Sequence, residues 1–255
     1  MSNIRVSAVS YLNTKPLIYG IFNHPVYKML DLSLDIPSRC AQKLILDQVD
    51  LALMPVGALH DLDNYEIVSD YCIGADGTVR TVCIYSDVPM EEINIVYLDY
   101  HSRTSVLLAQ HLFKHYWKKE VMFLPGPEGF EERISGTSAG LVIGDKALDQ
   151  ELKSSYIYDL SEAWRSLYGL PFVFAAWVSK KKLREEFITN FNAAQSQGIA
   201  RIDQLVQLMA NTRKHFDLDE YYNKNISYIF DAEKKKALEL FLSVTKEDIY
   251  STIKN

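Results

Sequence analysis

One stretch of the sequence joins a strand-like run to a helical run through a turn rich in hydroxyl side chains. The run from Ile93 to Leu98 is apolar and β-branched, which is typical of a buried strand. The run from Val106 to Tyr116 has apolar residues three and four positions apart, which predicts an amphipathic helix. The turn between them contains Ser102, Arg103, Thr104 and Ser105.

This turn has the chemistry of an anion-binding position. Hydroxyl residues at the start of a helix bring N-cap oxygens and the first backbone N–H groups together. The helix dipole adds partial positive charge there, which favours a carboxylate or a phosphate. We therefore expect the turn to hold an anionic small molecule. The competing interpretation is that Ser102 or Thr104 only caps its own helix, since hydroxyl caps are common.

The charge and cysteine content exclude several classes of protein. A formal net charge of −6 at pH 7 argues against a nucleic-acid binder, which needs a basic face. An anionic ligand would accordingly need a local positive site, because the field of the whole protein does not attract it. Cys40, Cys72 and Cys83 form no Cys-x-x-Cys pair, which predicts buried reduced thiols and neither a disulfide framework nor a zinc site.

The sequence contains no recognisable targeting or membrane signal. Its first residues enter a strand pattern directly and lack the basic start, apolar core and cleavage site of a signal peptide. No run is long and apolar enough to cross a bilayer. We expect a cytoplasmic protein that binds neither membranes nor nucleic acid.

Strand-like and helical stretches alternate along the chain, which predicts an α/β protein. The predicted strands cover residues 4–9, 32–36, 49–55, 65–73, 78–86, 93–98, 121–124, 138–143 and 169–178. The predicted helices cover 37–46, 106–116, 161–166, 183–195, 198–211 and 232–242, together with a helix that starts near Pro16. Asn13 or Thr14 is expected to cap that first helix, and Asp159 to cap the helix at 161–166. Residues 74–77 are expected to turn, and everything after Lys180 to be helical.

This order predicts two lobes. Residues 1–88 with 178–255 would form lobe 1, which includes the C-terminal helices, and residues 89–177 would form lobe 2. A ligand of such a fold is expected in the cleft between the lobes, at the carboxyl ends of the strands. Several hydrogen-bonding residues fall at predicted strand ends or strand-to-helix turns: Asn13, Thr81, Ser102, Thr104, Ser105 and Asp145.

Other catalytic or metal-binding patterns are absent from the sequence. It has no phosphate-binding glycine loop, dinucleotide fingerprint or nucleophile elbow. His111 and His115 have metal-ligand spacing on a predicted helix, but the sequence shows no third ligand near them, so no metal site is predicted. His101 borders the hydroxyl-rich turn, where a surface histidine is favoured over a catalytic one.

Taken together, several stretches resemble the chorismate dehydratase family of the futalosine route to menaquinone. They are Ser10-Tyr-Leu-Asn-Thr-Lys-Pro-Leu17, Val49-Asp-Leu-Ala-Leu-Met-Pro55, Ser102-Arg-Thr-Ser-Val106, Ile143-Gly-Asp-Lys-Ala-Leu148 and Asp159-Leu-Ser-Glu-Ala-Trp164, the last of which runs into Gly169-Leu-Pro-Phe-Val-Phe-Ala-Ala-Trp177. They stand in the family's order and cover about two thirds of the chain. The resemblance implies a type II periplasmic-binding-protein-like fold with two α/β lobes.

The resemblance also implies the reaction, in which chorismate loses water and becomes 3-[(1-carboxyvinyl)oxy]benzoate without a cofactor or a metal. Because the ring becomes aromatic, the enzyme has only to hold two carboxylates, exclude water and stabilise developing charge. By resemblance, Asn13 is the catalytic contact near the reacting ring. The implied substrate-binding residues are Thr14, Thr81, Ser102, Arg103, Thr104, Ser105 and Asp145. Arg103 and Asp145 have structural alternatives, and in the family serine often replaces Thr81.

No residue is identified as the base, and the enolpyruvyl carboxylate of the substrate is a candidate for taking the C3 proton. Three other functions are compatible with the fold. They are a solute-binding module, an enzyme like the naphthoate-forming synthase of the same pathway, and the effector-binding part of a regulator. The missing signal peptide argues against the first, the motif at residues 11–16 against the second, and the lack of a helix-turn-helix segment against the third.

Overall fold

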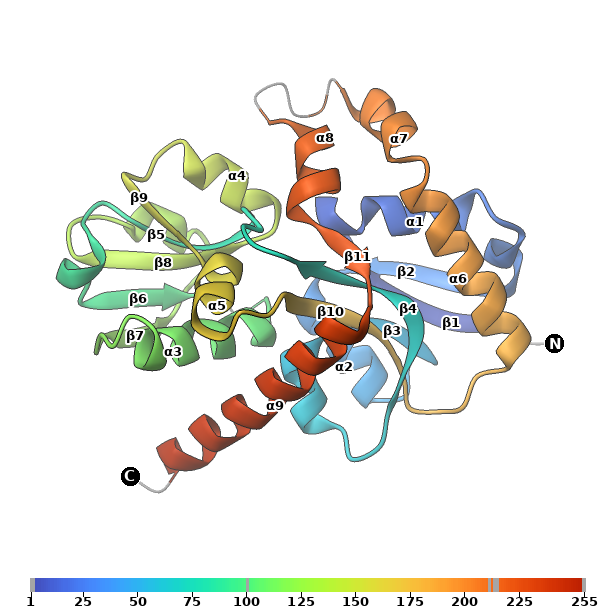
Figure 1. Cartoon of the computed structure of the whole chain (residues 1–255), viewed down its shortest axis with the longest axis horizontal. Coiled ribbons are helices and arrows are strands. Elements are labelled where there is room, and N and C mark those ends of the chain that lie inside the picture. The colour runs from blue at the N-terminus through green and yellow to red at the C-terminus, as the bar shows by residue number, and fades with distance from the viewer. Residues whose placement is uncertain (1–2, 100, 211, 213–215, 254–255) are drawn as a thin grey trace. The chain divides into compact units, whose positions relative to one another are not determined.

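The computed structural model describes residues 3–99, 101–210, 212 and 216–253, and the chain divides into two compact units. Unit 1 consists of residues 1–75 and 173–232, and unit 2 of residues 76–172 and 233–255. Each unit contains one β-sheet with helices packed against it (Figure 1).

The sheet of unit 1 has six strands in the order β11-β4-β10-β3-β1-β2. Their bounds are β1 Ile4–Val9, β2 Leu30–Asp35, β3 Leu51–Pro55, β4 Glu66–Ala75, β10 Phe172–Ser179 and β11 Ser227–Ile229. Strand β1 pairs in parallel with β2 and β3, whereas β10 runs antiparallel to β3. Every residue of β3 and β10 is buried, which explains their almost continuous apolar sequences.

The helices of unit 1 are α1 Lys15–Phe22, α2 Pro37–Ile45, α6 Glu185–Ile199, α7 Ile202–Met209 and α8 Leu218–Glu220. Helices α1 and α6 lie side by side in Figure 1, and glycine makes their approach possible. A Cβ atom on Gly20 would lie 2.0 Å from the carbonyl oxygen of Ala194, and one on Gly198 would lie 2.0 Å from that of Pro16. The two backbones therefore meet where neither helix carries a side chain.

The sheet of unit 2 has five strands in the order β7-β6-β8-β5-β9. Their bounds are β5 Val82–Ser86, β6 Ile95–Leu98, β7 Met122–Pro125, β8 Ser138–Ile143 and β9 Tyr156–Asp159. Strand β6 is parallel to β7 and β8, whereas β5 is antiparallel to β8 and β9.

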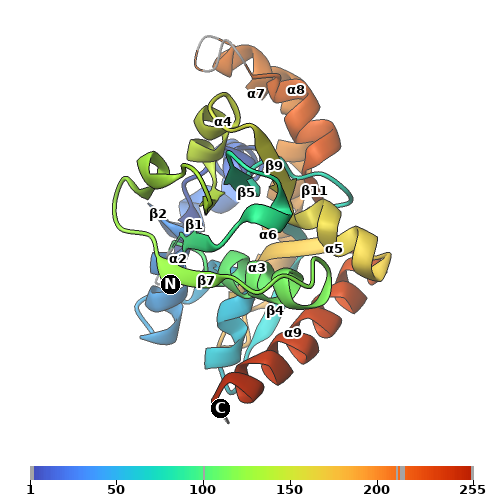
Figure 2. The same cartoon turned by 90° about the vertical axis from the view of Figure 1, so that its left-hand side faces the viewer.

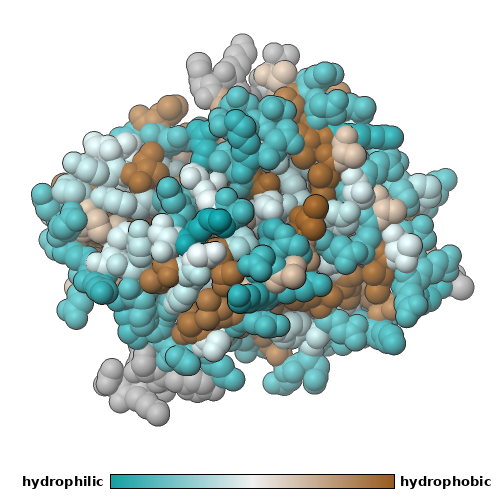
Figure 3. Space-filling model, viewed as in Figure 1, coloured by the Kyte–Doolittle hydropathy of each residue, from teal (hydrophilic) through white to brown (hydrophobic). Residues whose placement is uncertain are grey.

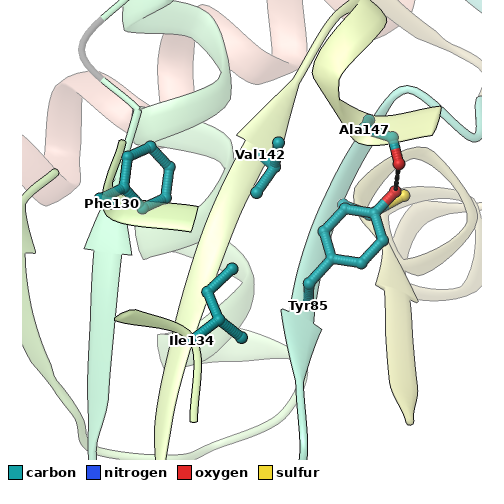
Figure 4. Close-up of a cluster of buried hydrophobic side chains, with 6 residues drawn as sticks. Tyr85, Phe130, Ile134, Val142 and Ala147 are labelled. Carbon is teal, nitrogen blue, oxygen red and sulfur yellow. Dashed lines mark hydrogen bonds between the residues drawn. The ribbon is translucent and has the colours of Figure 1, made fainter. Parts of the chain in front are cut away.

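An apolar cluster packs on this sheet (Figure 4). It contains Tyr85 of β5 and Val142 of β8, together with Phe130 and Ile134 from the segment between β7 and β8. The buried hydroxyl of Tyr85 donates a hydrogen bond of 2.9 Å to the carbonyl oxygen of Ala147, which satisfies it inside the core (Figure 4).

The helices of unit 2 are α3 Arg103–His115, α4 Asp145–Glu151, α5 Leu160–Tyr168 and α9 Ala232–Ile253. Figure 2 shows α3 between β7 and α5. Aromatic contacts hold both sides, since Phe113 of α3 meets Phe123 of β7 edge-on at 5.5 Å between ring centroids, and His111 of α3 stacks on Tyr168 of α5 at 5.8 Å. The described residues also form short 3₁₀ helices, η1 Leu12–Thr14, η2 Pro25–Met29, η3 Val56–Asp61, η4 Met90–Glu92 and η5 Phe130–Arg133, and the short π-helix η6 Tyr221–Asn225.

The division into units differs from the predicted lobes, 1–88 with 178–255 and 89–177, at three places. Strand β5 belongs to unit 2, because its partners β8 and β9 lie there, although it was expected in lobe 1. Strand β10 belongs almost entirely to unit 1, where it pairs with β3, although it was expected in lobe 2. Helix α9 belongs to unit 2 from residue 233 onward, although it was expected in lobe 1.

Three local predictions also need correction. Strand β9 was not expected, and β11 interrupts the chain after Lys180, which was expected to be entirely helical. Strand β4 continues to Ala75, so the predicted turn at 74–77 begins later, and Gly77 adopts a φ of 110°. The part of the predicted helix 198–211 that reaches residue 211 lies outside the described residues.

The face seen in Figure 3 mixes teal hydrophilic residues with smaller brown hydrophobic patches, as is ordinary for a protein surface. Among the helices that the structure describes, none is both long enough and apolar enough for a membrane crossing.

Candidate functional site

Strand pairing in unit 2 brings most of the predicted site residues to one edge of its sheet. Strands β6 and β8 are adjacent and parallel, so their carboxyl ends meet at the same edge. Strand β5 begins at that edge, because Val82 pairs with Ile143 at the end of β8. Residues 102–105 follow the end of β6, and Asp145 follows the end of β8 by two positions. Thr81 directly precedes the first residue of β5.

The hydroxyl-rich turn forms the N-terminus of α3. Ser102 is the N-cap, and its Oγ accepts a hydrogen bond from the Ser105 N–H at 3.4 Å and from the Ser105 hydroxyl at 3.1 Å. Ser102, Thr104 and Ser105 are buried, whereas Arg103 is exposed. That Ser102 caps its own helix is therefore confirmed, and whether it does only that is not decided by the cap. Binding of an anion at the same N-terminus stays a prediction, and the cap does not oppose it, because a helix start presents further N–H groups.

A titratable pair, which the sequence analysis did not assign to the site, lies just before this turn. Asp99 is only 2% exposed, and its Oδ1 accepts the His101 N–H at 2.9 Å and lies 3.4 Å from His101 Nδ1. Its Oδ2 is buried without a hydrogen-bond partner among the described residues. Burial raises the pKa of the Asp99 carboxyl group, which favours its protonated form. The pattern Asp-x-His before a hydroxyl-rich helix start is the sequence signal that could have indicated the pair.

Thr81 and Asp145 are brought together by the turn between β8 and α4. The Gly144 N–H donates a hydrogen bond of 2.9 Å to the Thr81 carbonyl oxygen, and Gly144 adopts a φ of 65°, which glycine does without strain. Asp145 is the first residue of α4 and is half-buried, and Thr81 is buried. A carboxylate in the first turn of a helix is favoured by the dipole, so the structural role of Asp145 is as well supported as a binding role.

Asn13 and Thr14 lie in unit 1, in the turn that follows β1. The expected cap of α1 is absent: Thr14 occupies the N-cap position, but its side chain makes no capping hydrogen bond, because the 3₁₀ turn η1 leads directly into the helix. Instead, the Thr14 hydroxyl donates to Asn13 Oδ1 at 3.1 Å. The buried Tyr228 hydroxyl donates a hydrogen bond of 2.9 Å to the Asn13 carbonyl oxygen. No sequence signal points to Tyr228, since it lies 215 positions away.

Other predicted features have structural roles. The Asp159 carboxylate caps α5 as predicted, accepting the N–H groups of Ser161 and Glu162, and it also accepts those of Val79 and Arg80. The three cysteines, Cys40, Cys72 and Cys83, are free and buried, as predicted.

Within the described residues, one group of side chains has the composition of a metal site. His111 and His115 of α3 meet Asp248 of α9, and one ligand atom from each residue lies within 4.8 Å of the others. The sequence pattern did not reveal Asp248 as a possible third ligand, because it lies 137 positions from His111.

Comparisons with known proteins agree with the resemblance described above. The sequence profile of a family described as "Menaquinone biosynthesis" matches residues 4–247. A chorismate dehydratase of Thermus thermophilus is 23% identical over 232 residues, which cover 81% of this chain and 83% of that protein. A chorismate dehydratase of Campylobacter jejuni is 35% identical over 115 residues, which cover 42% of this chain and 48% of that protein.

Solved structures show the fold. A protein of Archaeoglobus fulgidus superimposes with a TM-score of 0.72 at 16% identity, covering 96% of this chain and 97% of that chain. A Candida albicans protein described as having the generic periplasmic binding protein fold superimposes with a TM-score of 0.61 at 12% identity, covering 94% and 90%. The predicted periplasmic-binding-protein-like fold class is confirmed. Because the profile extends over nearly its whole length, the chain belongs to the menaquinone biosynthesis family.

Proposed function

We propose that this protein is a chorismate dehydratase, which converts chorismate to 3-[(1-carboxyvinyl)oxy]benzoate and water. The observation that carries the proposal is that most of the predicted site residues lie at one edge of the sheet of unit 2. The chain belongs to the menaquinone biosynthesis family, and its relatives include chorismate dehydratases. At that edge a helix N-terminus with three buried hydroxyl residues provides the donors that a carboxylate needs.

The proposed roles follow from the position of each residue. The turn of Ser102, Thr104 and Ser105 binds a substrate carboxylate through hydroxyl and backbone N–H groups, and Thr81 provides a further contact. Arg103 is exposed, so its guanidinium adds positive charge near the turn. Asn13, with Thr14 hydrogen-bonded to its side chain, is the proposed contact of the reacting ring. The role of Asp145 in binding rests on its place at the same edge.

The reaction removes the C3 hydrogen as a proton and the C4 hydroxyl group as water, and the bonding electrons of the C3–H bond complete the aromatic ring. We propose that the enolpyruvyl carboxylate of chorismate takes the C3 proton and passes it to the departing C4 hydroxyl group, so that one water leaves and the carboxylate is regenerated. We also propose that no resident metal or cofactor takes part. On this proposal His101 is not the base. Turnover of a His101→Asn variant should then stay within about threefold of wild type, whereas loss of one intrinsic proton-transfer group costs about 10²–10⁴-fold. A loss in that range would assign the proton transfer to His101.

The decisive experiment incubates purified protein with chorismate alone, after treatment with a chelator, and follows products by chromatography and mass spectrometry. The proposal requires an aromatic product that retains its enolpyruvyl group. Binding of chorismate without any product would instead indicate a solute-binding module. A different aromatic product would exclude the dehydratase assignment.

A matched pair of variants tests the turn. Thr104→Val keeps the shape of the buried side chain and removes its hydroxyl, whereas Thr104→Ser keeps the hydroxyl. We expect Thr104→Val to lower kcat/KM by about 10- to 100-fold, since a hydrogen bond to a charged group contributes about 1.5–3 kcal/mol, and Thr104→Ser to stay much closer to wild type. Equal activities in the two variants would remove Thr104 from the site. Asn13→Ala, with Ser196→Ala on the exposed side of α6 as the control, tests Asn13 in the same way.

A further inference from the structure

Helix α3 of unit 2 presents two histidines on one face, and α9 places a carboxylate against them. His111 and His115 are four residues apart, and their rings lie 4.4 Å apart between centroids. Asp248 Oδ2 lies 2.6 Å from His111 Nδ1, and Asp248 Oδ1 lies 3.1 Å from His115 Nε2. Two imidazoles and a carboxylate are a common ligand set for zinc and similar divalent ions.

The side chain of His111 is held in one orientation by a partner at each ring nitrogen. It is 3% exposed, and its second ring nitrogen, Nε2, lies 2.7 Å from the Tyr168 hydroxyl oxygen. When Nδ1 binds a cation, the ring proton can reside on Nε2 and be donated to Tyr168, so that no net proton is lost. Partners of this kind fix the ring and tautomer of metal-binding histidines.

The group can be reached from the surface of the unit. Asp248 lines a pocket of about 820 Å³, together with Leu107 and Gln110 of α3 and Thr245 of α9, although neither histidine is among its lining residues. His115 is 41% exposed, so an ion can reach the group from solvent.

One cation competes for the carboxylate. The Lys114 ammonium lies 2.7 Å from Asp248 Oδ1, and the Lys114 side chain is 53% exposed. Because an exposed ion pair of this kind contributes little, Lys114 can turn into solvent when a divalent ion binds. Removing the Lys114 ammonium should therefore strengthen the binding of a divalent ion. If the cluster were only a structural network of salt bridges, removing Lys114 would not increase metal affinity.

We propose that His111, His115 and Asp248 form a binding site for a divalent ion of the zinc class, which links α3 to the C-terminal helix α9. The site is separate from the proposed chorismate turn, which lies at the opposite end of α3. Bound metal would hold α9 against the helix that starts at that turn.

The test uses the full-length protein without a histidine tag, stripped by a chelator and titrated with Zn²⁺ by calorimetry, with Co²⁺ absorption as a second readout of the ligand set. We expect Zn²⁺ at about 100 times its Kd to raise the thermal unfolding midpoint by about 5–10 °C. Asp248→Asn and His115→Ala should each weaken binding more than about tenfold, and Lys114→Ala should strengthen it severalfold. His60→Ala, which removes a histidine of unit 1, is the control and should leave binding unchanged.

The outcomes separate the alternatives without reference to activity. If Zn²⁺ binds the wild-type protein no more tightly than it binds the His115→Ala variant, the proposal is overturned. Unchanged binding in Asp248→Asn, or weaker binding in Lys114→Ala, would overturn the role of Asp248 as a ligand. None of these measurements depends on chorismate turnover, so the metal-site proposal can hold even if the protein does not convert chorismate.

Discussion

Replacing Gly198 by alanine should separate two helices that hold unit 1 together. The new Cβ would lie 2.0 Å from the Pro16 carbonyl oxygen and 2.7 Å from the Gly20 backbone nitrogen. Both neighbours are backbone atoms, so no side chain can rotate away, and α1 must move relative to α6. Overpacking of this kind costs about 1–3 kcal/mol, and the rigid neighbours place Gly198→Ala near the upper end.

Helix propensity acts in the opposite direction. Alanine is favoured over glycine inside a helix by about 1 kcal/mol, which leaves a net loss of about 2 kcal/mol. For a protein of this size the loss corresponds to a fall of about 4–8 °C in the unfolding midpoint.

Circular dichroism during heating, together with urea unfolding, measures this effect. Ser196→Ala, on the exposed side of the same helix, is the control and should change the free energy of unfolding by less than about 0.5 kcal/mol. An unchanged or raised midpoint for Gly198→Ala would refute the close approach of α1 and α6.

Three further predictions concern stability. Asp159→Ala leaves four backbone N–H groups without their acceptor, two of them at the start of α5, and should cost about 2 kcal/mol or more in urea unfolding; Asp159→Asn, which keeps an acceptor oxygen, should cost less. Tyr85→Phe removes the hydrogen bond to the Ala147 carbonyl and should cost about 1 kcal/mol in the same assay, so a variant as stable as wild type would contradict that bond. Hydrogen bonds from Arg5 hold the pKa of Asp50 below its usual range, so this carboxylate stabilises the fold above about pH 4, and its contribution is lost as the pH falls through the lowered pKa. The difference in midpoint between wild type and Asp50→Asn should accordingly narrow from pH 7 to pH 3, and a constant difference would contradict the ion pair.

Some of the candidate site could be read from the sequence because it depends on neighbours along the chain. Ser102 caps α3 through the residue three positions later, and Asp159 caps α5 through residues two and three positions later. The place of Asp145 near a sheet edge also follows from the end of an apolar run, whereas Thr81 falls inside the predicted strand 78–86 and only the structure places it before β5. Tyr228, which binds the Asn13 carbonyl oxygen, gave no signal, because its contact is made across most of the chain length.

The sequence by itself determined where most strands and helices form, since burial of an apolar face imposes a period that is visible within a few residues. Strand β1 has its predicted bounds, whereas β9 and β11 escaped prediction because they are only four and three residues long and partly exposed. Only the tertiary structure decided which unit contains β5, β10 and α9, and that Asp248 lies beside His111 and His115. Strand pairing and the grouping of distant side chains depend on packing between segments far apart in the chain, and such contacts produce no periodic pattern of hydrophobic residues in the sequence.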